Sequence, residues 1–351
     1  MRSILAAKKT RRNKTNLRRW AQQSVGIVIS ILCLAIIFHR INLKELEKVI
    51  IQFHWQFLAI GLCSLAFDYF MRIQRWAIML RAAGAHVSTR VCAAPFLSSI
   101  ALNNVLPFRA GDIVRAFIFP TAMGVPKITA TASLLIERLV DLLTLLICFG
   151  IGLALCPINL PAWMRHAAAA FAIIGGGMLM LVIIFSPHIR NLLAKIKSKP
   201  KVKNHLKLCR ALDLGCDFLI KLTAMSHPQI LLKLFFISIF IWAGESGFFL
   251  AMLIGLNLHA TVPIAILVMA IATLSTLVPS SPGYVGPFHL AVFSVVSLLG
   301  NNPEQAASFA VLAHLGLWLP TTLAGAVAML SNPRLFRGRL NIEENNVAIN
   351  N

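Results

Sequence analysis

The sequence predicts an all-α, polytopic helical membrane protein with about six full spans and two re-entrant helical hairpins, arranged as an inverted repeat. Of its 351 residues, 58% are hydrophobic and only 13% are charged, and the mean hydropathy is +0.78. These values are typical of multi-span helical membrane proteins. In addition, two of the apolar regions are interrupted by Pro and Gly. Broken backbone at membrane depth is tolerated only against protein or a wet cavity.

The net charge of +21 would suggest a nucleic-acid partner in a soluble chain. Here the Lys and Arg residues cluster between the apolar runs, so membrane topology and attraction to anionic lipid explain them better. The seven Cys are scattered without a C-x-x-C pair, and the ten His show no metal-binding spacing. We therefore expect membrane lipids with anionic head groups as partners, no nucleic acid, no metal and no cofactor.

The first half begins with a basic cytoplasmic segment, residues 1–20, and an uncleaved first span at 21–38. Residues 39–54 look like a short amphipathic helix outside the membrane. The second span, 55–80, carries Asp68, Arg72 and Arg75 on one helix face. These three residues could serve a site, or they could form a salt bridge at the cytoplasmic end with Arg75 and Trp76 as interface anchors.

A first hairpin follows, with apolar arms at 91–106 and 113–123 and a break at 107–112. Asn103, Arg109, Asp112 and Arg115 lie in or beside this break, inside an apolar region where a charge must be paired or reach water. The third span, 128–155, carries three ionisable residues near its middle: Glu137, Arg138 and Asp141. Such a cluster is usually functional; the alternative is a neutralised cluster that pins helices together.

The second half begins with a fourth span at 164–185 and a basic cytoplasmic loop at 186–228, which holds a surface helix at about 203–223. A fifth span at 230–254 contains Glu245. A second hairpin follows, with its break at 279–289 and a short arm to residue 299. The last span, 304–330, contains His314, and residues 331–351 form a cytoplasmic tail.

The two halves, 21–155 and 164–330, share one order of elements, which together form a flippase-like transmembrane domain at 21–330. Aligning Pro107-x-x-x-Gly111 with Pro279-x-x-x-Gly283 places the two breaks opposite each other, and the distribution of basic residues gives the hairpins opposite orientations. Inverted repeats with broken helices place a binding site at the repeat interface, with helix N-termini available to an anion. Because the arms are apolar, a lipid phosphate suits the site better than a free ion.

We expect no catalytic residues. The substrate-binding residues that we predict are Asn103, Arg109, Asp112, Arg115, Glu137, Arg138, Asp141, Pro279, Ser281, Gly283, Tyr284, Gly286 and His289, with Asp68, Arg72, Arg75, Glu245 and His314 as accessory residues. Arg109, Arg115 and Arg138 would supply charge to the ligand, and the three neighbouring acids would pair with Arg in the empty state or carry a proton.

Four motifs carry a resemblance to a known family: R-x-x-R-W at 72–76, N-x-x-L-P-x-R-x-G-D-x-x-R at 103–115, E-R-x-x-D at 137–141 and P-x-S-P-G-Y-x-G at 279–286. Over about residues 15–330 the chain resembles the lysylphosphatidylglycerol synthase transmembrane family. The resemblance implies a standalone flippase-like protein, without the aminoacyl-transferase domain, that moves or binds a phospholipid or polyprenyl-phosphate-type lipid. One departure concerns Phe288-His289, where many members carry an acid; either His289 replaces that acid or the coupling differs.

The function we expect is translocation of an anionic lipid or lipid-linked head group, in the inner (plasma) membrane, with both termini cytoplasmic. An integral-membrane transferase acting on a lipid-linked substrate is the first alternative. Against it, the sequence has no D-x-D metal site, no nucleotide-binding loop and no G-x-S-x-G nucleophile motif. The second alternative is a small-anion transporter with no lipid substrate. No oligomeric state is predicted.

Overall fold

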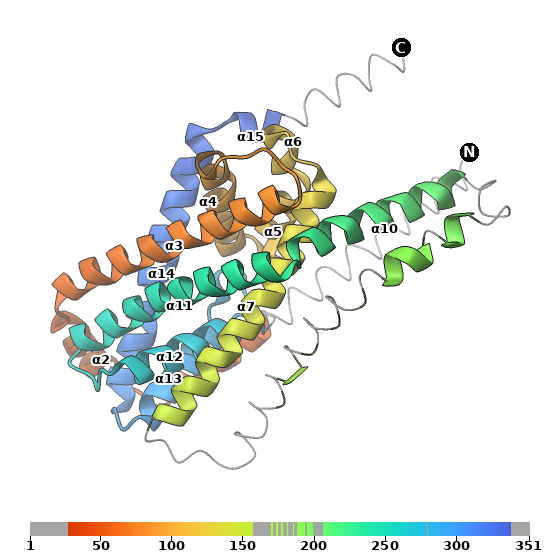
Figure 1. The fold of residues 1–351 in the computed structure, drawn as a ribbon. Coiled ribbons are helices and arrows are strands. Elements are labelled where there is room, and N and C mark those ends of the chain that lie inside the picture. The colour runs from red at the N-terminus through yellow and green to blue at the C-terminus, as the bar shows by residue number, and fades with distance from the viewer. Residues whose placement is uncertain are drawn as a thin grey trace, which may run out of the picture.

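The computed structural model describes residues 27–156, 206–278 and 280–337, with short pieces between 170 and 198. Its described part is helical, without a strand (Figure 1). Four helices are long and apolar enough to cross a membrane: α3 (Trp55–Ala82), α7 (Lys127–Leu155), α11 (Pro228–Gly255) and α14 (Pro303–Ser331). Helices of 28 or 29 residues extend about 42 Å, more than the roughly 30 Å of hydrocarbon in a bilayer. The prediction of an all-α polytopic membrane protein is confirmed.

The structure describes some of the other predicted segments in full, some in part and some not at all. The first span is described from Ile27, as a helix Ile27–Phe38 that meets α2 (Leu43–Ile51) at a bend of 87°. The predicted short amphipathic helix is thus present as α2, and its place outside the membrane stays a prediction. The surface helix at 203–223 corresponds to α10 (Leu206–Met225). Several predictions lie wholly or largely outside the described residues: segment 1–20, the fourth span at 164–185, the basic loop before 206, Pro279 and the tail after 337.

Each predicted hairpin is a pair of short helices joined by a non-helical turn. In the first, α4 (Thr89–Val105) leads through the turn η1 (Pro107–Arg109) to α5 (Ala110–Phe117) and α6 (Phe119–Met123). In the second, α12 (Val262–Ser275) leads through η2 (Pro282–Tyr284) to α13 (Pro287–Leu298). Within each hairpin the two arms pack against each other, α4 on α5 and α12 on α13.

The main contacts between helices recur when the two halves of the chain are interchanged, as two-fold symmetry requires. The equivalent helices α3 and α11 lie side by side across the molecule (Figure 1). The first hairpin packs on α14, the last span of the second half, and the second hairpin packs on α7, the last span of the first half. In the same way α2 contacts α14 and α10 contacts α7. Each half therefore completes the packing of the other.

The α3–α11 pair also shows that the repeat is inverted. The backbone N–H of His54, before α3, donates to Gly255 at the end of α11 (2.9 Å). Further along α3, Arg75 donates to Ser238, nearer the start of α11 (2.7 Å). The two helices are thus antiparallel, as equivalent spans of an inverted repeat must be.

The register of the repeat differs from the sequence alignment by three residues. In η1 the second and third residues have positive φ (Phe108 60°, Arg109 50°), and the same holds in η2 (Gly283 75°, Tyr284 61°). Pro107 therefore corresponds to Pro282, not to Pro279, and Arg109 corresponds to Tyr284. The P-x-x-x-G pattern occurs twice in the second break, starting at 279 and at 282, so the letters alone could not select the correct copy.

Gly111 and Asp112 also differ from the prediction, because they lie inside α5 and not in the break. The backbone departs from helix at residues 106–109 and is helical again from Ala110. A Cβ atom on Gly111 would lie 1.8 Å from the carbonyl oxygen of Ser99. Gly111 is thus needed for the close approach of α5 to α4 and not as a helix breaker.

Candidate functional site

The turns η1 and η2 contact each other and form the walls of a cavity of about 540 Å³. Side chains and backbone from both hairpins line it, together with one residue of the first span. The lining residues are Ile27, Asn103, Leu106, Pro107, Phe108, Arg109, Thr276, Leu277, Val278, Ser280, Ser281, Pro282, Gly283 and Tyr284. The predicted meeting of the two breaks is therefore observed, and it encloses space for a ligand.

The cavity combines polar groups with an apolar rim. The polar lining residues from the predicted site are Asn103, Arg109, Ser281 and Tyr284. Around them, Phe108 is 58% exposed and Leu277 is 60% exposed. Large apolar side chains that stay exposed are expected where a protein faces hydrocarbon. The cavity thus offers a cation and hydroxyl groups beside surfaces that acyl chains can contact.

Two contacts position the Arg109 side chain at the junction of the two turns. Its guanidinium lies 5.7 Å from the ring centroid of Tyr284, its equivalent in the other half, and Nη2 donates to Thr276 Oγ1 (3.2 Å). Within the described residues Arg109 forms no ion pair with a carboxylate. Its left-handed backbone costs roughly 1–2 kcal/mol for a residue with a side chain. Such strain often accompanies a functional site.

Asp112 is held behind the cavity by three hydrogen bonds with two residues, Asn103 and Arg138. Asn103 Nδ2 donates to its carboxylate (2.9 Å), and the backbone N–H of Asp112 donates back to Asn103 Oδ1 (3.1 Å). Arg138 donates from α7 (2.8 Å). A carboxylate in the first turn of α5 also suits the positive end of the helix dipole. One N–H of the first turn of α5 is therefore taken by Asn103 of α4, and the Asp112 carboxylate lies beside the helix N-terminus.

Glu137 and Arg115 form a second buried pair in this region. Arg115 Nη2 lies 2.7 Å from Glu137 Oε1, and its guanidinium is within 4.7 Å of the Phe96 ring centroid and 5.3 Å of the Trp76 ring centroid. The Arg115 residue is only 2% exposed and does not line the cavity described above. The ion pair and the two rings surround the guanidinium, and the expected contact of Arg115 with a ligand stays a prediction.

The arginines on the inner face of α3 bind carboxylates of α3 itself and of other helices. Arg72 pairs with Asp68 (2.8 Å) and with Glu245 of α11 (2.6 Å). Arg75 pairs with Asp141 of α7 (2.6 Å). Arg75 is 2% exposed and Trp76 is 1% exposed, so they are core residues and not interface anchors.

The site therefore holds five arginines and five carboxylates, and one arginine differs from the rest. The carboxylates of Asp68, Asp112, Glu137, Asp141 and Glu245 each lie within 4.0 Å of an arginine nitrogen. Four arginines, at positions 72, 75, 115 and 138, make all of these contacts. Among the described residues of the site, Arg109 is the arginine without a carboxylate partner.

A smaller cavity of about 150 Å³ adjoins the first, since Thr276, Gly283 and Tyr284 line both. Asp68, Glu245 and His314 also line this smaller cavity. The Nε2 atom of His314 lies 2.7 Å from the carbonyl oxygen of Gly283, which ties α14 to the second turn.

The remaining predicted residues have packing contacts. His289 is buried with its ring 4.6 Å from that of His314, and Gly286 packs on the first span, where an added Cβ would lie 2.6 Å from Ser30 Cα. Ser30 accepts from the Ser281 N–H (3.0 Å) and donates to Val285 O (2.7 Å). The sequence reasoning missed Ser30, although it is one of only two hydroxyl side chains in the apolar run 21–38.

Comparison with known proteins gives two findings. The family model described as the lysylphosphatidylglycerol synthase TM region matches residues 23–325. The chain is also 23% identical, over 361 aligned residues, to a protein named glycosyltransferase AglD from Haloferax volcanii. That alignment covers 90% of this chain and 57% of the relative, so the chain spans somewhat more than half the length of the curated relative it matches.

Proposed function

The chain belongs to the lysylphosphatidylglycerol synthase transmembrane family, and from this premise we propose that it binds a membrane lipid by its anionic head group and translocates that head group across the bilayer. The observation that carries the proposal is the position of Arg109. It lines the cavity between the two turns, and the other four arginines already contact all five carboxylates of the site.

A lipid phosphate suits this cavity better than a free anion does. A guanidinium can donate two parallel hydrogen bonds to phosphate oxygens, and Ser281 and Asn103 line the same space. Beside them, the exposed side chains of Phe108 and Leu277 would contact acyl chains. A site for a small ion has no need of an apolar rim.

Translocation would use the symmetry of the two halves. Arg109 and Tyr284 are equivalent residues and contact each other, so they lie where the two halves meet. Rocking of one hairpin against the other would open the cavity first to one leaflet and then to the other, as in transporters built from inverted repeats. The ion pairs of Asp112 and Glu137 would keep the first hairpin attached to α7 as a rigid unit.

The proposal is tested by lipid translocation in proteoliposomes, with phosphatidylglycerol that carries a fluorophore on an acyl chain. We expect Arg109→Ala to reduce the translocation rate at least about tenfold, because a charge-assisted contact is worth about 1.5–3 kcal/mol. Arg109→Lys should retain part of the rate, since it keeps the charge but not the fork. Arg90→Ala is the matched control, because Arg90 is an exposed arginine on the same hairpin.

Equal rates for wild type, Arg109→Ala and protein-free liposomes would refute translocation by this protein. Uptake of radiolabelled inorganic phosphate, measured in the same vesicles, separates a small-anion transporter from a lipid translocator. Transport of phosphate without transport of the lipid would favour the small-anion alternative.

A second candidate function is supported by the name of the relative, a glycosyltransferase. On that basis the chain would act on a lipid-linked sugar instead of only moving a lipid. Incubation of the purified protein with radiolabelled nucleotide sugars and a polyprenyl phosphate separates the two candidates. A new covalent lipid product that requires the protein would favour the transferase, and unchanged lipids would favour the translocator.

A further inference from the structure

A third cavity, of about 480 Å³, lies between α7, α11 and α12, away from the two turns. Its lining extends along α11 from Phe235 to Leu250, a distance of about 22 Å at 1.5 Å per residue. The cavity is thus a groove elongated along α11, a shape that suits an extended chain better than a compact head group.

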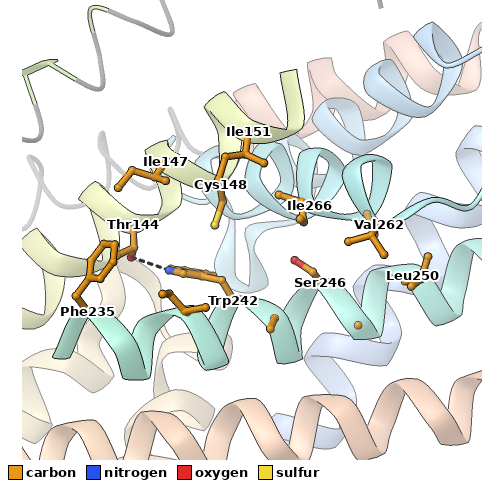
Figure 2. Close-up of a pocket in the computed structure, with 14 residues that line it drawn as sticks. Thr144, Ile147, Cys148, Ile151, Phe235, Trp242, Ser246, Leu250, Val262 and Ile266 are labelled. Carbon is orange, nitrogen blue, oxygen red and sulfur yellow. Dashed lines mark hydrogen bonds between the residues drawn. The ribbon is translucent and has the colours of Figure 1, made fainter. Parts of the chain in front are cut away.

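The walls of the groove are apolar and face outward. Among them, Ile239 of α11 is 48% exposed and Val262 of α12 is 58% exposed, and both helices belong to the membrane domain. Figure 2 shows the groove bounded by α7 on one side and α11 on the other, with Trp242 near one end and Val262 and Leu250 at the other. At this position in a membrane domain, two occupants come into question, lipid hydrocarbon and the predicted span 164–185, most of which lies outside the described residues.

One buried polar group in the groove has no partner. Ser246 is 7% exposed, and its Oγ makes no hydrogen bond within the described residues. On the same helix, Ser238 donates to the carbonyl oxygen of Leu234 (2.7 Å), which is the usual way a serine is satisfied inside a helix. In Figure 2 the oxygen of Ser246 is directed toward α12, into the groove. A buried hydroxyl without a partner costs free energy unless a ligand accepts from it.

The other polar side chains of the groove are already satisfied. Trp242 Nε1 donates to Thr144 Oγ1 (2.7 Å), and Thr144 Oγ1 donates to Val140 O (2.8 Å). The guanidinium of Arg72 lies over the ring of Trp242, 5.0 Å from the ring centroid. Trp242 therefore separates the groove from the ion-pair network. Ser246 is therefore the donor that a ligand in the groove would meet.

We propose that this groove binds the ester-linked acyl chain of a membrane lipid, with Ser246 donating a hydrogen bond to the ester carbonyl. The carbonyl would enter from the end at Leu250 and Val262, near the ends of the helices, and the chain would extend toward Phe235. This site is separate from the Arg109 cavity and goes beyond the proposed translocation. The competing occupant is the predicted span 164–185, but residues 167–185 of that span carry no polar side chain to accept from Ser246.

The test uses the full chain in lipid nanodiscs with phosphatidylglycerol bearing a photoreactive diazirine on its acyl chain, in an ester-linked and an ether-linked form. Adducts are mapped by peptide mass spectrometry. In wild type we expect the ester lipid to label the groove segments 144–151 and 239–250 about fivefold more than the ether lipid, the effect of one hydrogen bond. Ser246→Ala should remove this preference.

One variant that fills the groove and one control variant test whether the labelling occurs in the groove. Ala243 is an exposed groove residue, so Ala243→Trp should fill the groove without disturbing the core and should abolish its labelling. Leu232→Trp is the control, since Leu232 is an exposed residue of α11 outside the groove. Uniform labelling along α11, equal labelling by ester and ether lipids in wild type, or labelling unchanged by Ala243→Trp would overturn the proposal. A groove that gives no adduct in any variant would also overturn it and would indicate that segment 164–185 fills the space.

Discussion

At the scale of single residues, the arginines of the site have two kinds of environment. Arg115 is enclosed by two aromatic rings and paired with Glu137, whereas Arg109 lines a cavity with no carboxylate partner among the described residues. In the sequence both residues are arginines of one motif, at 103–115. The difference between them arises from the helices that pack around each one.

The first prediction contrasts the stability of Arg115→Ala and Arg109→Ala. Arg115→Ala leaves Glu137, 4% exposed, without its main partner, and loss of one member of a buried ion pair costs about 3–5 kcal/mol. Arg109→Ala leaves no carboxylate unpaired and should change stability little. Thermal unfolding of both variants in detergent measures the contrast. The double variant Arg115→Leu with Glu137→Leu should recover most of the loss, and a failure to recover would show that the pair is not the cause.

At the scale of elements, the two turns show what a sequence pattern can and cannot specify. Pro and Gly correctly predicted two interruptions of helix. That the polar residues of these interruptions bind a ligand stays a prediction. The register between them was wrong because the P-x-x-x-G pattern is present twice in the second break. Only the dihedral angles show that Phe108 corresponds to Gly283.

The second prediction uses this equivalence between Phe108 and Gly283. Both have positive φ, which costs roughly 1–2 kcal/mol for a residue with a side chain and nothing for Gly. In addition, a Cβ on Gly283 would lie 3.0 Å from Trp318 Nε1. Gly283→Ala should therefore lower the melting temperature, whereas Phe108→Gly, at an exposed position, should not lower it. A tolerated Gly283→Ala would show that the second turn can relax its backbone.

The ion-pair partners were the part of the site that sequence reasoning could not supply. Spacing along one helix correctly placed Asp68 and Arg72 together, because residues four apart share a helix face. The partner of Arg75, however, is Asp141 of α7, and Glu245 reaches Arg72 from α11. Such contacts depend on which helices pack together, and the apolar patterns of membrane helices do not encode their neighbours.

At the scale of the whole molecule, the inverted repeat places equivalent surface helices at opposite ends of α3. α2 ends just before α3 begins, whereas α10 reaches the other end of α3, where Lys221 donates to the carbonyl oxygen of Ala83 (2.8 Å). Because α3 is long enough to cross the bilayer, these two helices should lie on opposite sides of the membrane. With the N-terminus in the cytoplasm, as the basic residues at 1–20 predict, α10 is the cytoplasmic helix.

The third prediction tests this arrangement by cysteine labelling. Glu47 of α2 and Asp217 of α10 are both exposed, so Glu47→Cys and Asp217→Cys, each in a background without the seven native cysteines, should react with a membrane-impermeant maleimide from opposite sides. In intact cells only Glu47→Cys should be labelled, and Asp217→Cys should react only after the membrane is permeabilised. Labelling of both positions from the same side would exclude an inverted repeat. Labelling of Asp217→Cys alone in intact cells would preserve the repeat but reverse its orientation, because the two halves exchange sides together.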